Sequence, residues 1–138
     1  MLGAVFRIGG GRWSDLIGSR LIPLRRIGLA LAAAMGASAA ATAAPLAVAV
    51  AAFLLAGGLS MAWNGLSFTA AAEAAGEARS GAAIGFQQTV LSVIGAVVPP
   101  GFAALVAGTS WRTAFAVAAA IPLAGWWALG LVTERPRA

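Results

Sequence analysis

The sequence contains no cysteine, histidine, tyrosine or lysine, and few charged residues of any kind. Without cysteine and histidine, the chain offers no disulfide framework and no zinc site built on those ligands. Without histidine, most nucleophile–histidine catalysis is excluded as well. Charged residues make up 9% of the 138 residues and hydrophobic residues 61%, whereas a typical soluble domain has about a quarter of its residues charged. This composition excludes a soluble globular domain.

The few charges divide the chain into long uncharged runs. There are 46 uncharged residues between Arg26 and Glu73, and 32 between Arg79 and Arg112. A further 21 separate Arg112 from Glu134. Because a helix that crosses a bilayer needs roughly 20 apolar residues, these runs accommodate two, one and one crossings. A membrane β-barrel would instead show alternating segments of about ten residues. The sequence therefore predicts an all-α integral membrane protein with four transmembrane helices and the lipid bilayer around them.

All nine basic residues are arginines, and they are distributed unequally between the two sides of a four-span chain. Eight lie before the first predicted span, between the second and third, or after the last, and only Arg112 lies on the other side. This is the positive-inside asymmetry, so we expect both termini to be cytoplasmic and the chain to lie in the cell inner (cytoplasmic) membrane. A pI near 11.9 also suits nucleic-acid binding. Arginines at the ends of apolar runs do not form a basic face or tail, so we expect no nucleic-acid partner.

Four segments are predicted to cross the membrane, over about residues 24–42, 46–72, 81–107 and 111–132. Residues 1–26 are predicted to hold the end of a preceding span and then a glycine- and arginine-rich cytoplasmic loop over 9–26. Residues 133–138 are predicted to be a cytoplasmic tail. Because the connections after residue 26 are short, neighbouring spans should be antiparallel and adjacent.

Residues 11–20 read GRWSDLIGSR. This stretch resembles the loop signature of major facilitator superfamily (MFS) transporters, G-x-x-x-D-[RK]-x-G-[RK]-[RK]. In that family the signature joins the second and third spans and, more weakly, the eighth and ninth. Leu16 departs from it where a basic residue is usual, and Ser19 is a common variant in the second copy. The matching positions are Gly11, Asp15, Gly18 and Arg20.

Three later segments are similar to the same family in the same order. EAAG at 73–76 with RSGAAIG at 79–85 resembles the loop between spans ten and eleven, PPG at 99–101 the eleventh span, and WRTAF at 111–115 the start of the twelfth. The resemblance covers nearly the whole chain and implies the end of span eight followed by spans nine to twelve. It implies a C-terminal fragment of a secondary transporter that moves a small solute by alternating access. Its partners would be the missing N-terminal spans, and we expect no transport by the chain alone.

The loop resemblance also implies a gating role for Gly11, Asp15, Gly18 and Arg20. Asp15 is an anion on the predicted cytoplasmic side, where the third span begins near Ser80. A carboxylate there is favoured by the partial positive charge of a helix N-terminus, and such a contact would bias one state of the transport cycle. The alternative is that the charges of this loop form only a solvated, positive-inside segment.

Polar residues at membrane depth are candidates for the substrate cavity because they are costly unless paired or hydrated. In the second span Ser60, Asn64 and Ser67 share one helical stripe, flanked by Trp63. The family resemblance implies that this span lines the cavity. Asn64 can donate and accept hydrogen bonds, and is the leading substrate-contact candidate. The alternatives are an interhelical hydrogen bond for Asn64 and packing for Trp63.

The third span contributes two further features. Gln88 shares a stripe with several small residues and faces either the cavity or a partner helix, whereas Gln87 points about 100° away. Pro99 and Pro100 remove backbone donors and are predicted to interrupt and kink this span. Such a kink suits gating or plain architecture.

The predicted spans contain no acidic residue, and no metal, cofactor or catalytic group is expected. Asp15, Glu73 and Glu77 show no pairing with a nucleophile or metal, so an enzyme is disfavoured. Two other membrane functions stay open. A small four-span transporter working as an oligomer would be expected to carry a glutamate inside its first span, and none is present. A non-transporting scaffold subunit would need no loop signature. The substrate, the direction of transport, the coupling ion and the oligomeric state do not follow from these residues.

Overall fold

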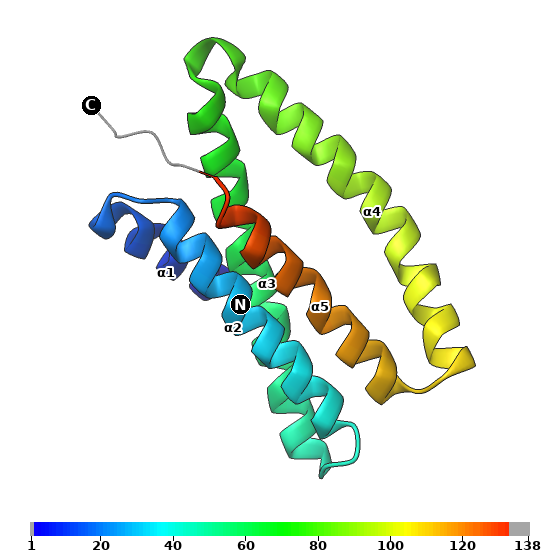
Figure 1. The fold of residues 1–138 in the computed structure, drawn as a ribbon. Coiled ribbons are helices and arrows are strands. Elements are labelled where there is room, and N and C mark those ends of the chain that lie inside the picture. The colour runs from blue at the N-terminus through cyan, green and yellow to red at the C-terminus, as the bar shows by residue number, and fades with distance from the viewer. Residues whose placement is uncertain (1, 133–138) are drawn as a thin grey trace.

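The computed structural model describes residues 2–132, which form five α-helices and one short 3-10 turn without any β-strand in that range (Figure 1). The turn η1 (Glu77–Arg79) joins α3 to α4. Four of the helices are long and apolar enough to cross a membrane. The prediction of an all-α fold with four helices of membrane-spanning length is therefore confirmed. In chain order the helices are α1 (Leu2–Ile17), α2 (Leu21–Ala41), α3 (Leu46–Ala75), α4 (Ser80–Gly108) and α5 (Trp111–Leu129).

The segment before α2 differs from the prediction. We expected a loop over 9–26, but α1 continues to Ile17 and the connection is only Gly18–Arg20. Gly18 turns the chain with a φ of +65°, a conformation that glycine adopts without steric cost. The loop prediction was wrong because it relied on the weak helix propensity of Gly9–Gly11, which the packing of α1 against α3 overrides.

Glycines lie in the contact between the helices α1 and α3. A Cβ atom at Gly3 would lie 2.9 Å from Cγ of Met61, and a Cβ atom at Gly65 would lie 2.9 Å from Cγ of Arg7. Gly10 is buried, and a Cβ atom there would meet side chains of α2 and α3 at 3.4 Å. Small residues at the contact are a common way for helices to pack in lipid. We call this α1–α3 contact the glycine seam.

The helix α2 packs against α3 and α5 and holds the largest share of the buried side chains. One buried cluster joins Leu24 and Ile27 of α2 to Ala62 and Leu66 of α3. At the end of α2 that follows the turn, the guanidinium of Arg25 lies over the ring of Trp126 in α5, 5.3 Å from its centroid. The N-terminal end of α2 and the C-terminal end of α5 therefore lie on the same side of the molecule.

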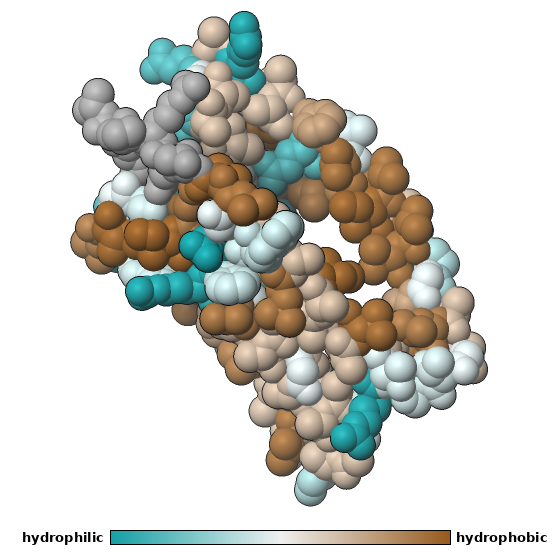
Figure 2. Space-filling model, in the orientation of Figure 1, coloured by the Kyte–Doolittle hydropathy of each residue, from teal (hydrophilic) through white to brown (hydrophobic). Residues whose placement is uncertain are grey.

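The helix α4 is the least enclosed part of the described chain. No residue from Ser80 to Gly108 is buried. Over the middle of its length α4 runs apart from α5 (Figure 1), and an opening between them remains in the space-filling view (Figure 2). A hydrogen bond from Gln87 to Ser67 of α3 ties one part of α4 to the bundle. Ring contacts of Phe102 with α5 tie the other.

The predicted interruption of the helix at Pro99 and Pro100 is absent. The helix α4 continues through both prolines. Each proline removes one backbone hydrogen-bond donor, but the φ of proline is fixed near the helical value, and the helical conformation is kept at both positions. The kink at these positions stays a prediction.

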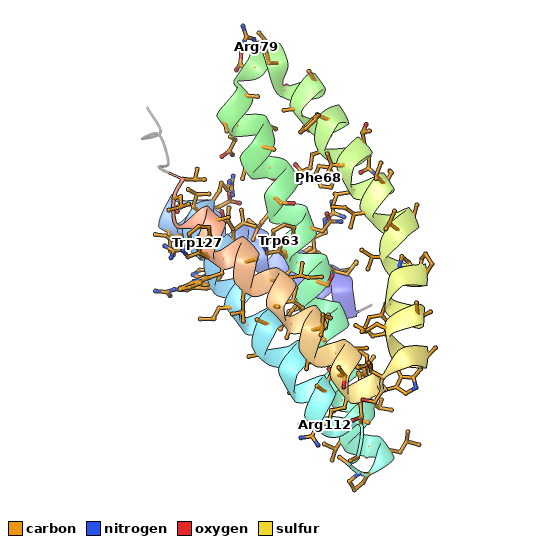
Figure 3. All side chains as sticks on the ribbon, turned by 45° about the vertical axis from the view of Figure 1, so that its right-hand side comes forward. Trp63, Phe68, Arg79, Arg112 and Trp127 are labelled. Carbon is orange, nitrogen blue, oxygen red and sulfur yellow. The ribbon has the colours of Figure 1, made fainter. Side chains whose placement is uncertain are left out.

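The outside of the molecule is dominated by apolar side chains (Figure 2). Large exposed hydrophobic residues occur on α2, α3, α4 and α5 alike. A soluble monomer rarely exposes so much continuous apolar surface, whereas a bilayer requires it. Arg79 and Arg112 lie at opposite ends of the bundle (Figure 3), as expected for connections on the two sides of a membrane.

Candidate functional site

The polar stripe predicted for the second span lies on α3, and its three members are half-buried. Ser67 donates a hydrogen bond of 2.9 Å to the backbone carbonyl of Asn64, one turn earlier. Phe68 extends into the space between α3 and α4, whereas Trp63 lies on the side of α3 that faces α5 (Figure 3). Ser60 lies one turn before Asn64 on the same stripe.

Ser67 also connects this stripe to α4. The side-chain Nε2 of Gln87 donates a hydrogen bond of 2.8 Å to Ser67 Oγ. Because the single hydroxyl hydrogen of Ser67 is already given to the Asn64 carbonyl, Ser67 can only accept from Gln87. This fixes the orientation of the Gln87 amide, with nitrogen toward Ser67 and oxygen away from it.

Two buried amide oxygens at this place have no hydrogen-bond partner among the described residues: Oδ1 of Asn64 and Oε1 of Gln87. A third buried atom without a partner, Nε of Arg25, lies at the end of α2. Buried polar atoms normally find partners, since leaving one unpaired costs about 1–3 kcal/mol. Asn64, Ser67 and Gln87 are therefore a hydrogen-bonded group with two side-chain oxygens whose acceptor capacity is unused. We call it the amide cluster.

Two of the predicted cavity residues lie elsewhere. Gln88 is exposed on α4, and its neighbour Gln87 makes the contact with α3 instead. The ring of Trp63 packs against the buried cluster and lies beside Gly28 of α2, where a Cβ atom would be 3.7 Å from its Nε1. This position agrees with the packing alternative for Trp63. The helical period alone could not select Gln87, because that choice depends on how α4 is rotated against α3.

The loop signature forms a second polar group, at the end of the bundle where α1 meets α2. The Arg20 guanidinium donates to both carboxylate oxygens of Glu73: Nη2 lies 2.9 Å from Oε1, and Nε lies 3.1 Å from Oε1 and 3.2 Å from Oε2. It also bonds Asp15 and the buried hydroxyl of Ser14. Ser14 in turn donates to the backbone carbonyl of Ser19 at 2.8 Å. Arg20 thus fastens the α1–α2 turn to the C-terminal end of α3, and we call this group the arginine clasp.

The expected partner of Asp15 was the N-terminus of the third span near Ser80. In the structure Asp15 pairs with Arg20 instead. The full positive charge of the guanidinium attracts the carboxylate more strongly than the partial positive charge of a helix N-terminus. Hydrogen bonding to Glu73 is the main cause that raises the pKa of Arg20 above its ordinary value; burial opposes this rise, and hydrogen bonding to Asp15 adds to it. The arginine therefore stays charged at every physiological pH.

The two signature glycines differ in their local roles. Gly18 is required by its positive φ in the turn, whereas a Cβ atom at Gly11 would meet no atom within 4 Å. Nothing in the structure explains a glycine at position 11. Within residues 2–132 no group of three or more acidic side chains is placed to hold a metal ion.

Comparison with known proteins finds relatives among membrane transporters. An uncharacterized MFS-type transporter of Mycobacterium tuberculosis strain H37Rv is 37% identical over 124 residues, which cover 90% of this chain and 28% of that protein. A second, from strain CDC 1551, is 36% identical with the same coverage. No family model matches the chain, and no solved structure matches it significantly.

The chain thus spans little more than a quarter of the length of the curated relatives it matches. Those relatives are transporters rather than enzymes, and the four apolar helices agree with a multi-pass membrane protein. The similarity extends over nearly all of the described helices. Over 90% of its length the chain is similar to MFS-type transporters, the family that the residues at 11–20 resemble.

Proposed function

We propose that this chain forms four membrane-spanning helices of an MFS secondary transporter, which moves a small solute by alternating access. The observation that carries the proposal is the similarity over 90% of the chain to MFS-type transporters more than three times its length. Alternating access requires two halves that rock about a site between them. The helices described here would supply part of one half, so transport requires further spans, which the family resemblance assigns to the N-terminal side.

The chain is proposed to lie in the inner (cytoplasmic) membrane of the cell. In the proposed orientation both termini are in the cytoplasm. The positive-inside rule supports it, because Arg20, Arg25 and Arg79 all belong to the end of the bundle opposite Arg112. The arginine clasp then faces the cytoplasm, and the connection between α4 and α5 faces outward.

The proposed solute site is the amide cluster on α3 and α4. Its two unpartnered oxygens accept hydrogen bonds, so the solute should present hydroxyl or amide donors. No aspartate or glutamate lies in α2, α4 or α5, and the one in α3, Glu73, is bound by Arg20 near the helix end. A solute recognised here would therefore be held by hydrogen bonds rather than by opposite charge.

The proposed gate is the arginine clasp. It joins the turn before α2 to the end of α3 across 53 residues of sequence, so it exists only when those two ends are close. A movement that opens the cytoplasmic side would have to separate them. The clasp would thereby favour the state in which the cytoplasmic side is closed.

The mass of the native protein tests the proposal. An antibody against the tail at 132–138 would be applied to membranes of the source cells after electrophoresis. We expect a band several times heavier than 13.6 kDa, as for a transporter with two halves. A band near 13.6 kDa would contradict the proposal that further spans belong to the same polypeptide.

A further inference from the structure

An apolar groove lies on the outside of the bundle where α1, α2 and α3 meet. Its volume is about 370 Å³, within the range of about 300–1,000 Å³ typical of small-molecule pockets. The groove is open along α1, where Val5 is 68% exposed. Its lining is almost entirely apolar and includes Val5, Phe6, Trp13, Ile27, Leu59 and Ala62.

A positive charge stands at one end of this groove. The guanidinium of Arg26 lies over the ring of Trp13, 5.8 Å from the ring centroid, and Trp13 is a wall of the groove. Arg26 is exposed and makes no ion pair with a described residue. Asp15, the acidic residue closest to Trp13 in sequence, is held by Arg20. The cation at the end of the groove is therefore available to an anion.

We infer that this groove binds an anionic phospholipid, with one acyl chain in the groove and the phosphate on Arg26. The apolar acyl chain of such a lipid matches the apolar lining of the groove, and its negatively charged phosphate matches the guanidinium of Arg26 at the end of the groove. Basic pockets between transmembrane helices on the cytoplasmic side favour anionic headgroups, and an aromatic ring beside an arginine is suited to the interface where headgroup and acyl chain join. This site is separate from the amide cluster and from the arginine clasp.

The experiment is native mass spectrometry of the full chain, released from membranes containing equal amounts of phosphatidylglycerol and phosphatidylcholine. We expect phosphatidylglycerol to be retained preferentially. Arg26→Gln should reduce this preference about fivefold, because each basic residue near the surface contributes about that factor to anionic-lipid binding. The matched control, Arg112→Gln at the opposite end, should leave the preference unchanged. An equal loss in both variants would overturn the inference, since bulk charge would then explain it.

A second variant tests the groove itself. Gly9 lines the groove, and a Cβ atom there would meet no atom within 4 Å, so Gly9→Leu should fill the groove without disturbing the helices. We expect Gly9→Leu to abolish lipid retention. The control is Gly57→Leu in α3, where a Cβ atom also meets nothing within 4 Å, and this variant should still retain the lipid. Unchanged retention in Gly9→Leu would overturn the inference. So would displacement of the lipid by glycerol phosphate alone, which would indicate a phosphate site without a chain groove. A dimer of this chain lost in Gly9→Leu would equally overturn it, because the occupant would then be a second copy.

Discussion

Arg20 is the residue with the largest set of polar contacts in the described chain, and they link parts that are distant in sequence. The loop pattern indicated Asp15 and Arg20 as members of one gating signature, but the partner expected for Asp15 was the N-terminus of the third span and not Arg20. The third member, Glu73, could not be predicted from that pattern. It lies 53 residues away, and only the parallel packing of α1 and α3 brings it to the same end.

Removing the charge of Glu73 should weaken the attachment of the turn to α3. Glu73→Gln is expected to lower the free energy of unfolding by about 1 kcal/mol, the upper range for a partly exposed ion pair. Thermal unfolding in a mild detergent at low and high salt measures this. The control is Glu77→Gln, four residues further on and outside the described ion pairs. Equal effects of the two variants would show that the clasp adds nothing specific.

Replacing Asn64 by leucine should affect stability and solute binding differently. Its Oδ1 is buried without a partner, so Asn64→Leu should leave stability unchanged or raise it by about 1 kcal/mol. Stabilisation by added hydroxyl- or amide-bearing solutes, measured as a shift of the unfolding temperature in the complete transporter, should disappear in the same variant. A loss of stability instead would mean that Asn64 has a structural partner.

Ser67 provides the matched comparison for the amide cluster. Ser67→Ala removes the acceptor of Gln87, and interhelical hydrogen bonds in membranes average about 0.6 kcal/mol. We therefore expect a loss of stability of about that size, again by thermal unfolding. A gain in stability would argue against the orientation assigned to the Gln87 amide.

The helices themselves followed from simple features of the sequence, and their ends from local chemistry. Long uncharged runs located the four apolar helices, because burying a charge in lipid is costly. The end of α3 at Ala75 depends on Gly76, whose φ is +76°, and α5 begins where the Ser110 hydroxyl accepts from the Thr113 amide. The helical state of 9–17 was missed, because there the decisive interaction is with α3 and not with neighbours in sequence.

The glycine seam should tolerate no added bulk at its buried position. Gly10→Leu is expected to cost about 1–3 kcal/mol, the usual penalty for overpacking, because its Cβ atom already lies 3.4 Å from Ile27 and Leu66. Its neighbour provides the control, since a Cβ atom at Gly9 meets nothing within 4 Å. Unfolding in detergent distinguishes the two variants. A similar cost for both would contradict the role of the seam, since leucine has a higher helix propensity than glycine at either position.

At the scale of the whole molecule, the bundle consists of a packed part and a loosely attached part. The buried clusters lie on α2 and α3, and α5 packs against one of them through Leu129. By contrast, α4 is attached by Gln87 and by an aromatic group. Phe115 is the centre of that group, with ring centroids 5.2 Å from Phe53 and 5.3 Å from Phe102. Neither attachment could be located from the sequence, because both depend on the rotation of one helix against another.

Removing the central ring should loosen α4 without unfolding the packed part. Phe115→Ala is expected to speed hydrogen exchange in the C-terminal half of α4, because ring pairs of this kind contribute about 0.5–1.5 kcal/mol each. Exchange in α2 should stay unchanged. Phe86→Ala, at a ring of α4 that is 74% exposed, is the control. Faster exchange throughout the chain would contradict the division into two parts.

The two attachments of α4 have a mechanical consequence. Gln87 and Phe102 are 15 residues apart, or about 22 Å at 1.5 Å per residue, and the helix between them resembles a beam supported near its ends. Bowing of this beam changes the width of the opening beside α5 while both supports stay in place. Its resistance is then set by the stiffness of the helix itself, and Pro99 and Pro100, whose missing donors soften a helix, lie within that unsupported length.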